Sequence, residues 1–454
     1  MVKFLRHDMR SATKLLSIFT FLAIFTGSPA AADIQVNLGE QGPDDDYICW
    51  GKVPVTVSFG SDDVLPSDVT ISSAPHNVGA PVGQIGFSLT RSVADPLATS
   101  IEVNIDQSTR SGQFFVAGTA ASIATKDVKI VVDPSDGSGS IELPVMVRVR
   151  KNAESLNDLE RDMFLQAFSD AARRNNQFAK YWGVHTDAVR MAHQVAFLPW
   201  HRVFLINLER ELQLENPAVA LPYWEFDKPS PSLFSTDFLG MVGNLPNPQE
   251  VEFSAGNPLR QFRLTDPRVT PLTRRQNGDV LVSSSINKFF FGEEQHGIMT
   301  NEIFGPYHGQ AHVFIGGLVG DIERSPADPL FFLLHANVDR AWAAWQRHYD
   351  RFDRSEPSAY ALQGTHSPGS GVLEGNFVDD TMWPWDNEVR PSEPINITIG
   401  RVNLPPKVGA AAGVVSNPQV GHMLDYLDLI GEGSTHNYCY DTVPAGTGDV
   451  VDFP

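Results

Sequence analysis

Three histidines lie close together in the chain at spacings that suit a metal site. His308 and His312 are four residues apart, so on a helix both imidazoles occupy one face, one turn apart. Asp328 and Pro329 predict the start of a second helix, with Asp as N-cap and Pro at the first helical position. His335 lies on that helix. Three imidazoles on two facing helices can bind one metal ion, and imidazole suits copper, zinc, iron and nickel.

A second group of three histidines lies upstream, so that six of the thirteen histidines fall into two groups. Pro199 predicts a helix start, which places the last histidine of this group in the first helical turn. Apolar residues then follow at helical spacing and predict a buried face. The group consists of His185, His193 and His201.

The composition of these two groups favours one metal over the others. Two ions held by three imidazoles each would have no carboxylate ligand. Binuclear hydrolases generally mix carboxylates with histidine, because harder metals prefer oxygen ligands. A pair of sites built only from imidazole therefore favours copper, and a binuclear zinc hydrolase remains an alternative.

Several motifs occur together in a fixed order. The chain contains FLPWHR, HxxxH and DPLFFLxHxxxDR, followed by YCY at Tyr438 to Tyr440. Together they resemble the type-3 copper proteins, which include tyrosinases, catechol oxidases and, more distantly, molluscan haemocyanins. The resemblance covers roughly residues 147 to 442. It also includes LPYWEFD at Leu221 to Asp227 and DDTMWPW at Asp379 to Trp385.

This resemblance implies an enzyme and its cofactors. A polyphenol oxidase of the catechol oxidase or tyrosinase type would hold two copper ions and use dioxygen as co-substrate. It would oxidise small phenols. Oxidation of o-diphenols would give o-quinones, and a monooxygenase activity would act on monophenols. The alternative is a dioxygen carrier with the same copper pair. The implied ligands are His185, His193, His201, His308, His312 and His335.

The chain departs from the family pattern at informative positions. His193 lies eight residues before His201, where relatives usually show nine. Gly309 follows His308, where many tyrosinases have Asn. In the family, that Asn and a nearby Glu are thought to hold a water that deprotonates monophenols, and Glu302 is the candidate here. With Gly309, we expect monophenol hydroxylation to be weaker than diphenol oxidation.

Residues around the histidines have expected supporting roles. Asp339 lies one turn after His335 and is expected either to hydrogen-bond a ligand imidazole or to pair with Arg340. Val313 is a candidate for choosing the phenol. Aromatic residues are expected to pack around the metals, namely Phe197, Trp200, Phe331 and Phe332.

The chain divides into an all-β part and a helical part. Short alternating segments separated by Gly, Pro, Asp and Ser predict a β-sandwich-like domain over residues 33–148, either a lid over the copper site or a passive stabilising domain. The period changes near residue 151, where Ser155 to Asp158 suggests a helix-capping box. Residues 149–442 are predicted to be mainly α, with a four-helix bundle that holds the metals. Residues 443–454 form a C-terminal tail.

The ends of the chain predict its compartment. A basic start, an apolar run from Leu15 to Phe25 and Ala30-Ala31-Ala32 are typical of a signal peptide over residues 1–32. We therefore expect a secreted or periplasmic protein with no stable membrane association after cleavage. Cys49 and Cys439 are the only cysteines, and in an exported protein they suggest one disulfide.

The overall charge of the chain indicates which classes of molecule it is expected to bind. The net charge is −20, and no Lys/Arg run exceeds a pair, so nucleic acid is an unlikely partner. The sequence leaves the oligomeric state open.

Overall fold

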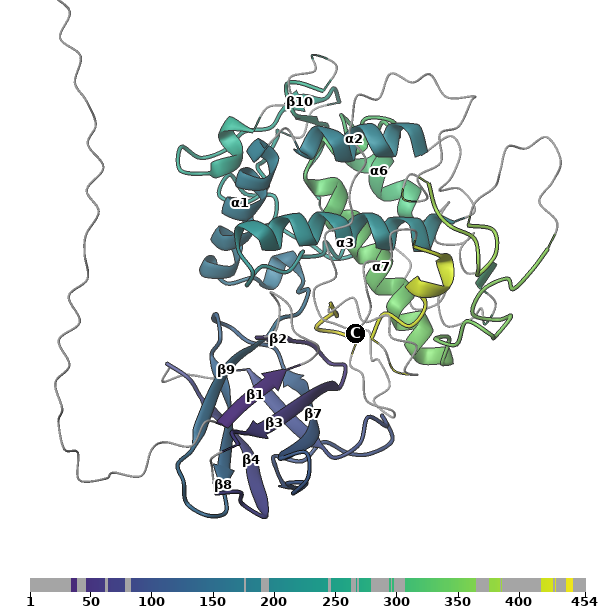
Figure 1. Cartoon of the computed structure of the whole chain (residues 1–454). Coiled ribbons are helices and arrows are strands. Elements are labelled where there is room, and N and C mark those ends of the chain that lie inside the picture. Colours follow the sequence, from purple (N-terminus) through teal and green to yellow (C-terminus); the bar gives the residue numbers. More distant parts are fainter. Residues whose placement is uncertain are drawn as a thin grey trace, which may run out of the picture.

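The computed structural model contains two sheets of strands followed by a helical part (Figure 1). The structure describes residues 34–38, 46–61, 64–77, 83–174, 177–188, 196–243, 246–262, 267, 269–278, 294, 296–297, 307–364, 375–383, 385, 418–427, 429 and 438–443. The segment expected to be a signal peptide and most of the tail lie outside these residues. No helix among the described residues is long and apolar enough to cross a membrane.

The described residues of the N-terminal part form nine strands in two sheets. One sheet has the order β1-β3-β7-β5, and the other has the order β2-β9-β8-β4-β6. All neighbouring strands are antiparallel except β2 and β9. The strands are β1 (Ile34–Leu38), β2 (Tyr47–Ile48), β3 (Val53–Phe59), β4 (Asp68–Pro75), β5 (Gln84–Ser88), β6 (Ser100–Asn104), β7 (Ser111–Ala120), β8 (Val128–Pro134) and β9 (Ile141–Val147).

Alternation of side chains explains this architecture. In β3 the side chains of Val55, Val57 and Phe59 are buried while those between them are only partly buried, and β8 follows the same rule. Each sheet thus presents one apolar face, and these faces belong to one continuous core. The all-β character of this part agrees with the prediction.

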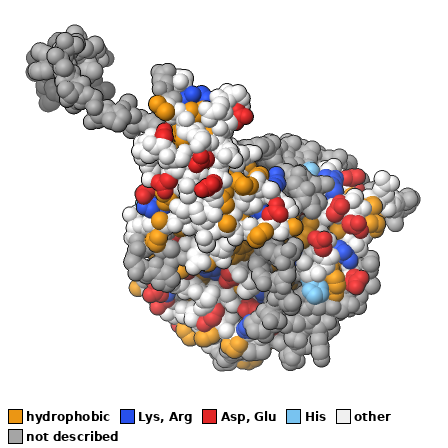
Figure 2. Space-filling view, turned by 90° about the horizontal axis from the view of Figure 1, so that it is seen from below, with side chains coloured by type: hydrophobic (Ala, Val, Ile, Leu, Met, Phe, Trp, Pro, Cys, Tyr) orange, Lys and Arg blue, Asp and Glu red, His pale blue; other side chains and the backbone are white. Residues whose placement is uncertain are grey.

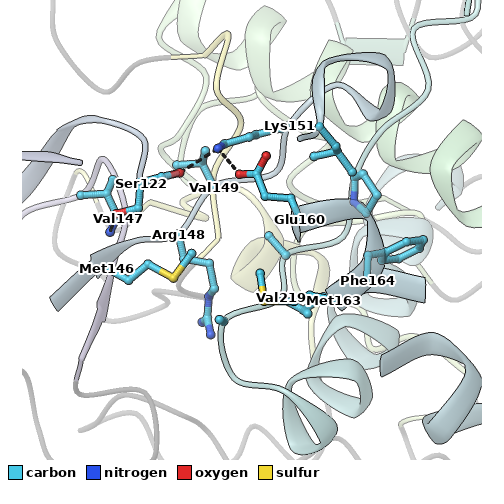
Figure 3. Close-up of a pocket in the computed structure, with 14 residues that line it drawn as sticks. Ser122, Met146, Val147, Arg148, Val149, Lys151, Glu160, Met163, Phe164 and Val219 are labelled. Carbon is cyan, nitrogen blue, oxygen red and sulfur yellow. Dashed lines mark hydrogen bonds and ion pairs between the residues drawn. The ribbon is translucent and has the colours of Figure 1, made fainter. Parts of the chain in front are cut away.

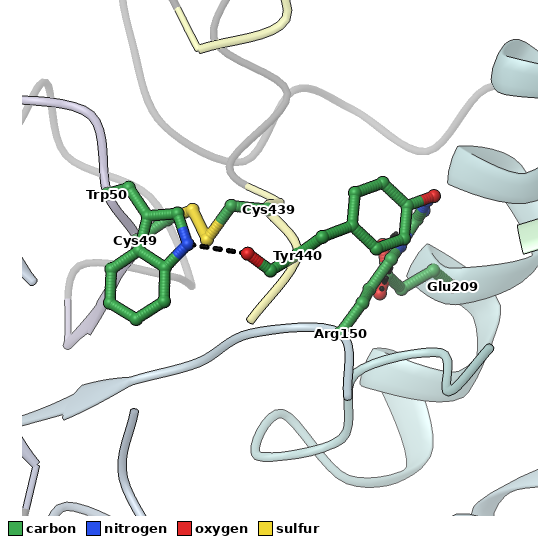
Figure 4. The surroundings of a disulfide bond; sticks show 6 residues. All are labelled: Cys49, Trp50, Arg150, Glu209, Cys439 and Tyr440. Atoms are coloured by element: carbon green, nitrogen blue, oxygen red, sulfur yellow. Dashed lines mark hydrogen bonds and ion pairs between the residues drawn. A yellow bond between two sulfur atoms is a disulfide. The ribbon is translucent and has the colours of Figure 1, made fainter. Parts of the chain in front are cut away.

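The two parts are covalently joined. Cys49 and Cys439 form a disulfide with a Cα–Cα distance of 6.1 Å, so the start of the β part is linked to the end of the described chain (Figure 4). Beside it, Trp50 donates its indole N–H to the Tyr440 carbonyl at 2.7 Å. The backbone of Arg150 also pairs with this segment, because its N–H donates to the Cys439 carbonyl at 2.7 Å.

A shallow hollow marks the junction between the last strand and the first helix (Figure 3). Lys151 spans it, donating to the Ser122 carbonyl at 2.7 Å and pairing with Glu160. Met146 and Met163 line the same hollow from the strand side and the helix side. The junction is therefore a mixed apolar and ionic contact and not a loose linker.

Among the described residues, five α-helices and several short elements form the helical part. They are η1 (Ala153–Ser155), α1 (Asp158–Arg173), α2 (Gln177–Ala188), α3 (Phe197–Glu215), β10 (Gln249–Glu250), η3 (Pro258–Gln261), β11 (Thr273–Arg274), α6 (Gly309–Ile315), η5 (Ser325–Ala327), α7 (Leu330–Tyr349) and η6 (Val420–Met423). The helix α3 lies at the centre and contacts both α1 and α7. Its buried residues include Trp200 and Phe204, whose rings stack with centroids 4.8 Å apart.

The helix starts differ from the predicted ones by a few residues. The capping box of α1 is formed by Asn157 and Glu160, not by the segment that begins at Ser155. The first turn of α3 begins at Phe197, two residues before Pro199, so His201 lies in the second turn. Proline is tolerated in a first turn because the N–H it lacks has no helical partner there.

The start of α7 is close to the predicted one. Asp328 accepts a hydrogen bond from the backbone N–H of Leu330 at 2.9 Å, and Pro329 stands at the boundary. Asp328 also forms a buried ion pair with Arg274, with a shortest distance of 2.7 Å. This pair fixes the N-terminal end of α7. His335 lies five residues after Leu330, the first residue of this helix.

Candidate metal centre

Three imidazoles converge between α6 and α7. His308 immediately precedes α6, His312 lies within it, and His335 lies on the second turn of α7. The Nε2 atom of His335 is 3.3 Å from Nε2 of His308 and 3.3 Å from Nε2 of His312. A tetrahedral metal with bonds of about 2.0–2.1 Å needs ligand nitrogens about 3.3–3.4 Å apart. These two separations fit a bound metal ion.

A backbone carbonyl orients His312 toward the other two rings. Its Nδ1–H donates to the Val319 carbonyl at 2.6 Å, so the lone pair of this neutral ring is on Nε2, which faces His335. The loop after α6 brings that carbonyl into position because Gly316 and Gly317 adopt positive φ angles of 62° and 59°.

The upstream histidines lie directly beside this group. His201 stacks on His335, with ring centroids 4.0 Å apart and an interplanar angle of 7°. The ring of His185, on α2, is 5.8 Å from that of His201, and both side chains are buried. His201 directs its Nδ1 to the Phe197 carbonyl at 2.8 Å, one turn earlier on α3. His193 lies outside the described residues.

Two phenylalanines separate the imidazoles from water. Phe331 lies 4.2 Å from the His335 ring and 4.9 Å from the His185 ring, measured between centroids. Phe197 lies 4.9 Å from His308. Both phenylalanines are fully buried, as the aromatic pattern predicted.

Burial keeps the imidazoles uncharged. Desolvation lowers the pKa of His312 to about 4, although its hydrogen bond to Val319 acts in the opposite direction. Desolvation also holds the pKa of His335 well below its ordinary value, and the neighbouring rings of His201 and His308 lower it further. Neutral imidazole is the form that binds a metal ion.

The donor set of this group is three imidazoles with no carboxylate: His308, His312 and His335. The ligand atoms lie within 4.8 Å of one another. Nitrogen donors of this kind suit copper and zinc better than calcium or magnesium, which require oxygen. The residues present therefore fit copper.

Asp339 differs from both sequence-based expectations. Its carboxylate accepts hydrogen bonds from Arg202 Nε at 2.6 Å, Arg150 Nη1 at 3.2 Å and the Tyr440 hydroxyl at 2.7 Å. The expected partners, a ligand imidazole or Arg340, were wrong because Arg340 projects from the helix in another direction, toward Glu225. No local spacing indicated these partners, which come from distant parts of the chain.

The residues expected to tune phenol chemistry are only partly described. Gly309 is the first residue of α6 and is half-buried beside His308. Val313, beside His312, leaves 66% of its surface exposed. Glu302 lies outside the described residues, so its distance to the histidines stays a prediction.

These features define a helical metalloprotein with a buried polyhistidine centre. Residues 175–288 and 272–348 match the family model described as the common central domain of tyrosinase. The chain is 32% identical over 269 residues to the tyrosinase of Streptomyces antibioticus, covering 53% of this chain and 93% of that protein. The chain belongs to the tyrosinase family of type-3 copper proteins. The strands β1 to β9 precede the matched residues.

Two further relatives are more distant. The chain is 26% identical over 221 residues to a hemocyanin of Enteroctopus dofleini, units Oda to Odg, covering 44% of this chain and 7% of that protein. The solved tyrosinase of Burkholderia thailandensis is 14% identical, with a TM-score of 0.39, covering 68% of this chain and 76% of that one.

Proposed function

We propose that this protein is a type-3 copper oxidase that uses dioxygen to oxidise o-diphenols to o-quinones and, more weakly, hydroxylates monophenols. The observation that carries the proposal is the convergence of His308, His312 and His335, with His201 stacked on this group. Membership of the tyrosinase family supports the choice of reaction.

The proposed centre has two copper ions with three histidines each. One ion would be held by His308, His312 and His335. The other would be held by His185, His201 and His193, the last assigned only from the family resemblance. The supporting scaffold would be a four-helix bundle of α2, α3, α6 and α7, because each of these helices contributes or adjoins a histidine of the centre.

When bound, the copper pair supplies the site for dioxygen and the path for electrons from the phenol. The protein itself does three things. Backbone carbonyls of Val319 and Phe197 fix the orientation of two imidazoles. Phe197 and Phe331 exclude water, and burial keeps the rings neutral. The exposed Val313 beside His312 suggests the side from which a small phenol approaches.

A dioxygen carrier with the same copper pair is the second candidate. The similarity to a hemocyanin favours it, since that protein shares part of the same sequence region. A carrier would bind dioxygen reversibly but would turn over phenols poorly. Turnover with a simple catechol therefore separates the two functions.

We also propose that the protein is exported, to the periplasm or the medium. The predicted signal peptide over residues 1–32 supports this, and so does the Cys49–Cys439 disulfide, because such bonds persist in oxidising compartments. Fractionation of cells that express the full chain would test it, and a protein retained in the cytoplasm would contradict it.

The activity is tested by oxygen uptake of the copper-loaded protein, residues 33–454, with catechol as substrate. His308→Ala is the matched control, because it removes one proposed ligand from the centre. We expect rapid uptake by the wild-type protein and none above background by the variant. Copper-loaded wild-type protein that binds dioxygen reversibly but does not consume it with catechol would favour the carrier.

A further inference from the structure

A buried cluster of charges lies next to the two groups of histidines. Its members are Arg150, Arg202, Glu209, Asp339 and Tyr440, and each is at most 3% exposed. Two arginines and two carboxylates balance in charge. Taking such groups out of water is unfavourable unless every charge has a well-placed partner. A charge-balanced set at this depth points to a positional role.

Asp339 is the member that joins the two groups of histidines. It lies one turn after His335 on α7, and its Oδ1 accepts from Nε of Arg202 at 2.6 Å. Arg202 directly follows His201 on α3. Thus one ion pair links the helix of one group to the helix of the other, next to the place where the rings of His201 and His335 stack.

The second oxygen of Asp339 is held from outside the two helices. Arg150, in the segment between β9 and η1, donates to it at 3.2 Å, and the Tyr440 hydroxyl donates at 2.7 Å. Arg150 is itself fixed by Glu209 of α3 at 2.8 Å, and Figure 4 shows Arg150 between Glu209 and Tyr440. Tyr440 adjoins Cys439 of the disulfide. The carboxylate therefore has little freedom to turn.

Arg202 is equally constrained. Its guanidinium donates to Gln346 Oε1 at 2.8 Å and to the Met423 carbonyl at 2.6 Å. It lies over the ring of Trp342, with its carbon 3.7 Å from the ring centroid. Because several partners hold the guanidinium of Arg202, this side chain transmits a displacement of α3 directly to Asp339.

We propose that Asp339 is a positioning residue that sets the separation of the two metal sites, through Arg202 on one side and through Arg150 and Tyr440 on the other. The inference rests on the proposed dicopper centre. It assigns a supporting role toward that centre to the segment that joins the β part to the helices, which contains Arg150, and to the Cys49–Cys439 disulfide beside Tyr440.

The test compares Asp339→Asn with a control at Glu225, another buried carboxylate, which pairs with a residue of the same helix α7. Glu225→Gln removes the carboxylate that pairs with Arg340, the next residue of α7, but that pair leads away from α3. Both variants lose one buried negative charge. Only the first loses the link between the two groups of histidines.

Two readouts separate positioning from general stability. Copper affinity is measured by competition with a chelator, and the cupric protein is examined by electron paramagnetic resonance. Two cupric ions at bridging distance couple and give no signal, whereas separated ions give one. Thermal unfolding of the metal-free proteins shows how much each substitution destabilises the fold.

For wild type we expect two copper ions per chain and a silent cupric spectrum. In Asp339→Asn, affinity for at least one ion should fall about 10- to 100-fold, and a cupric signal should appear. Glu225→Gln should keep wild-type affinity and a silent spectrum. If Asp339→Asn does not fold, Tyr440→Phe, which removes only the hydroxyl, should show a smaller weakening in the same direction.

Three results would overturn the inference. Wild-type affinity and a silent spectrum in both Asp339→Asn and Tyr440→Phe would show that the carboxylate does not position the centre. An equal effect in Glu225→Gln would reduce its role to general stability. Wild-type protein that binds no copper would remove the proposed function itself, and the inference with it.

Discussion

Single residues decide which chemistry the centre supports. The imidazole of His312 points its Nε2 toward His335 because the Val319 carbonyl holds the opposite nitrogen, and both rings are kept neutral by burial. Beside them, Gly309 contributes no side chain at the position where a polar group could orient a water. We therefore expect the residue after His308 to influence which phenols react.

The substitution Gly309→Asn tests this dependence. An Asn side chain beside His308 would supply a hydrogen-bonding group for a water that accepts the monophenol proton. We expect the ratio of monophenol to diphenol turnover to rise, measured by oxygen uptake with matched substrates. Gly309→Ala, which adds no polar group, should leave the ratio at the wild-type value. An unchanged ratio in Gly309→Asn would count against the role assigned to this position.

Another buried imidazole, His296, makes stability depend on pH. It packs 4.4 Å from the Tyr360 ring between centroids, and burial, with Arg202 nearby, lowers its pKa from 6.5 to about 3. Between these values the unfolded chain binds a proton that the folded chain does not. The contribution of the neutral His296 imidazole to the free energy of unfolding is therefore complete above pH 6.5. It declines as the pH falls toward about 3.

Replacing this imidazole should flatten the pH profile. In His296→Phe the ring contacts remain but the titrating group is absent. We expect the slope of unfolding free energy against pH to decrease by about 1.4 kcal/mol per pH unit between these two pKa values. Denaturant unfolding of the metal-free protein at several pH values measures it, and an unaltered slope would show that His296 does not titrate in this way.

At the scale of elements, the helices place the histidines, and their ends are set by specific caps. The N-terminus of α1 is closed by Asn157, whose side chain accepts from the Glu160 N–H at 2.9 Å while Glu160 accepts from the Asn157 N–H at 3.0 Å. Phe164 and Phe168 of α1 lie in the core, and α1 contacts α3. This cap thus supports the helix on which His201 lies.

Substitution of the cap gives a quantitative expectation. Asn157→Ala should lower the free energy of unfolding by about 1 kcal/mol, because it leaves a helix N–H without its partner. Ser155→Ala is the matched control, since Ser155 Oγ donates only to the Asn152 carbonyl and caps no α-helix. Denaturant unfolding measures both. A larger loss for Ser155→Ala would mean that the cap is misassigned.

Local patterns explain how far the elements were predictable. The four-residue spacing of His308 and His312 and the Asp328-Pro329 pair depend on one helix each, and the structure places these residues together as expected. Asp339 was assigned the wrong partners, because its contacts come from Arg150, Arg202 and Tyr440, which are far apart in sequence. Spacing within a helix carries no information about such contacts.

The β part also shows how far local sequence patterns predict structure. The strand β3 has the alternating Val residues that predict a strand, whereas β4, with the sequence DVTISSAP, shows a weaker pattern. Its Ser and Ala residues weaken the alternation, yet it pairs with both β6 and β8. Its place in the sheet is therefore secured by its neighbours more than by its own composition.

At the scale of the whole molecule, the contacts of the β part bear on its role. In the described chain they fall on residues near the C-terminal end of α3, on the N-terminal half of α1 and its cap, and on Cys439 and Tyr440. Glu215 ends α3 fourteen residues after His201, about 21 Å along the helix. The exposed Val313 lies on α6. This arrangement favours a stabilising support over a lid.

The outer surface is mixed in character. On the face in Figure 2, acidic and basic side chains are interspersed, and hydrophobic side chains gather in small groups between them. The whole chain has 54 acidic and 34 basic residues, and the absence of a nucleic-acid partner stays a prediction.

Removing the disulfide tests whether the β part acts as a stabilising support or as a lid over the site. The bond closes a loop with a sequence separation of 390 residues, so the Cys49→Ser/Cys439→Ser variant should be less stable by about 2–5 kcal/mol. Diphenol oxidation should stay at or below the wild-type rate. A several-fold activation would instead show that the β part restrains the site, as a lid would.

The metal content of the purified chain tests the dicopper centre most directly. Wild type and His335→Ala are incubated with equal amounts of copper and zinc salts, freed of unbound ions and subjected to elemental analysis. The type-3 assignment predicts two copper ions per wild-type chain, little zinc, and loss of at least one copper ion in the variant. Wild-type protein that retains zinc in place of copper, or no metal, would contradict it.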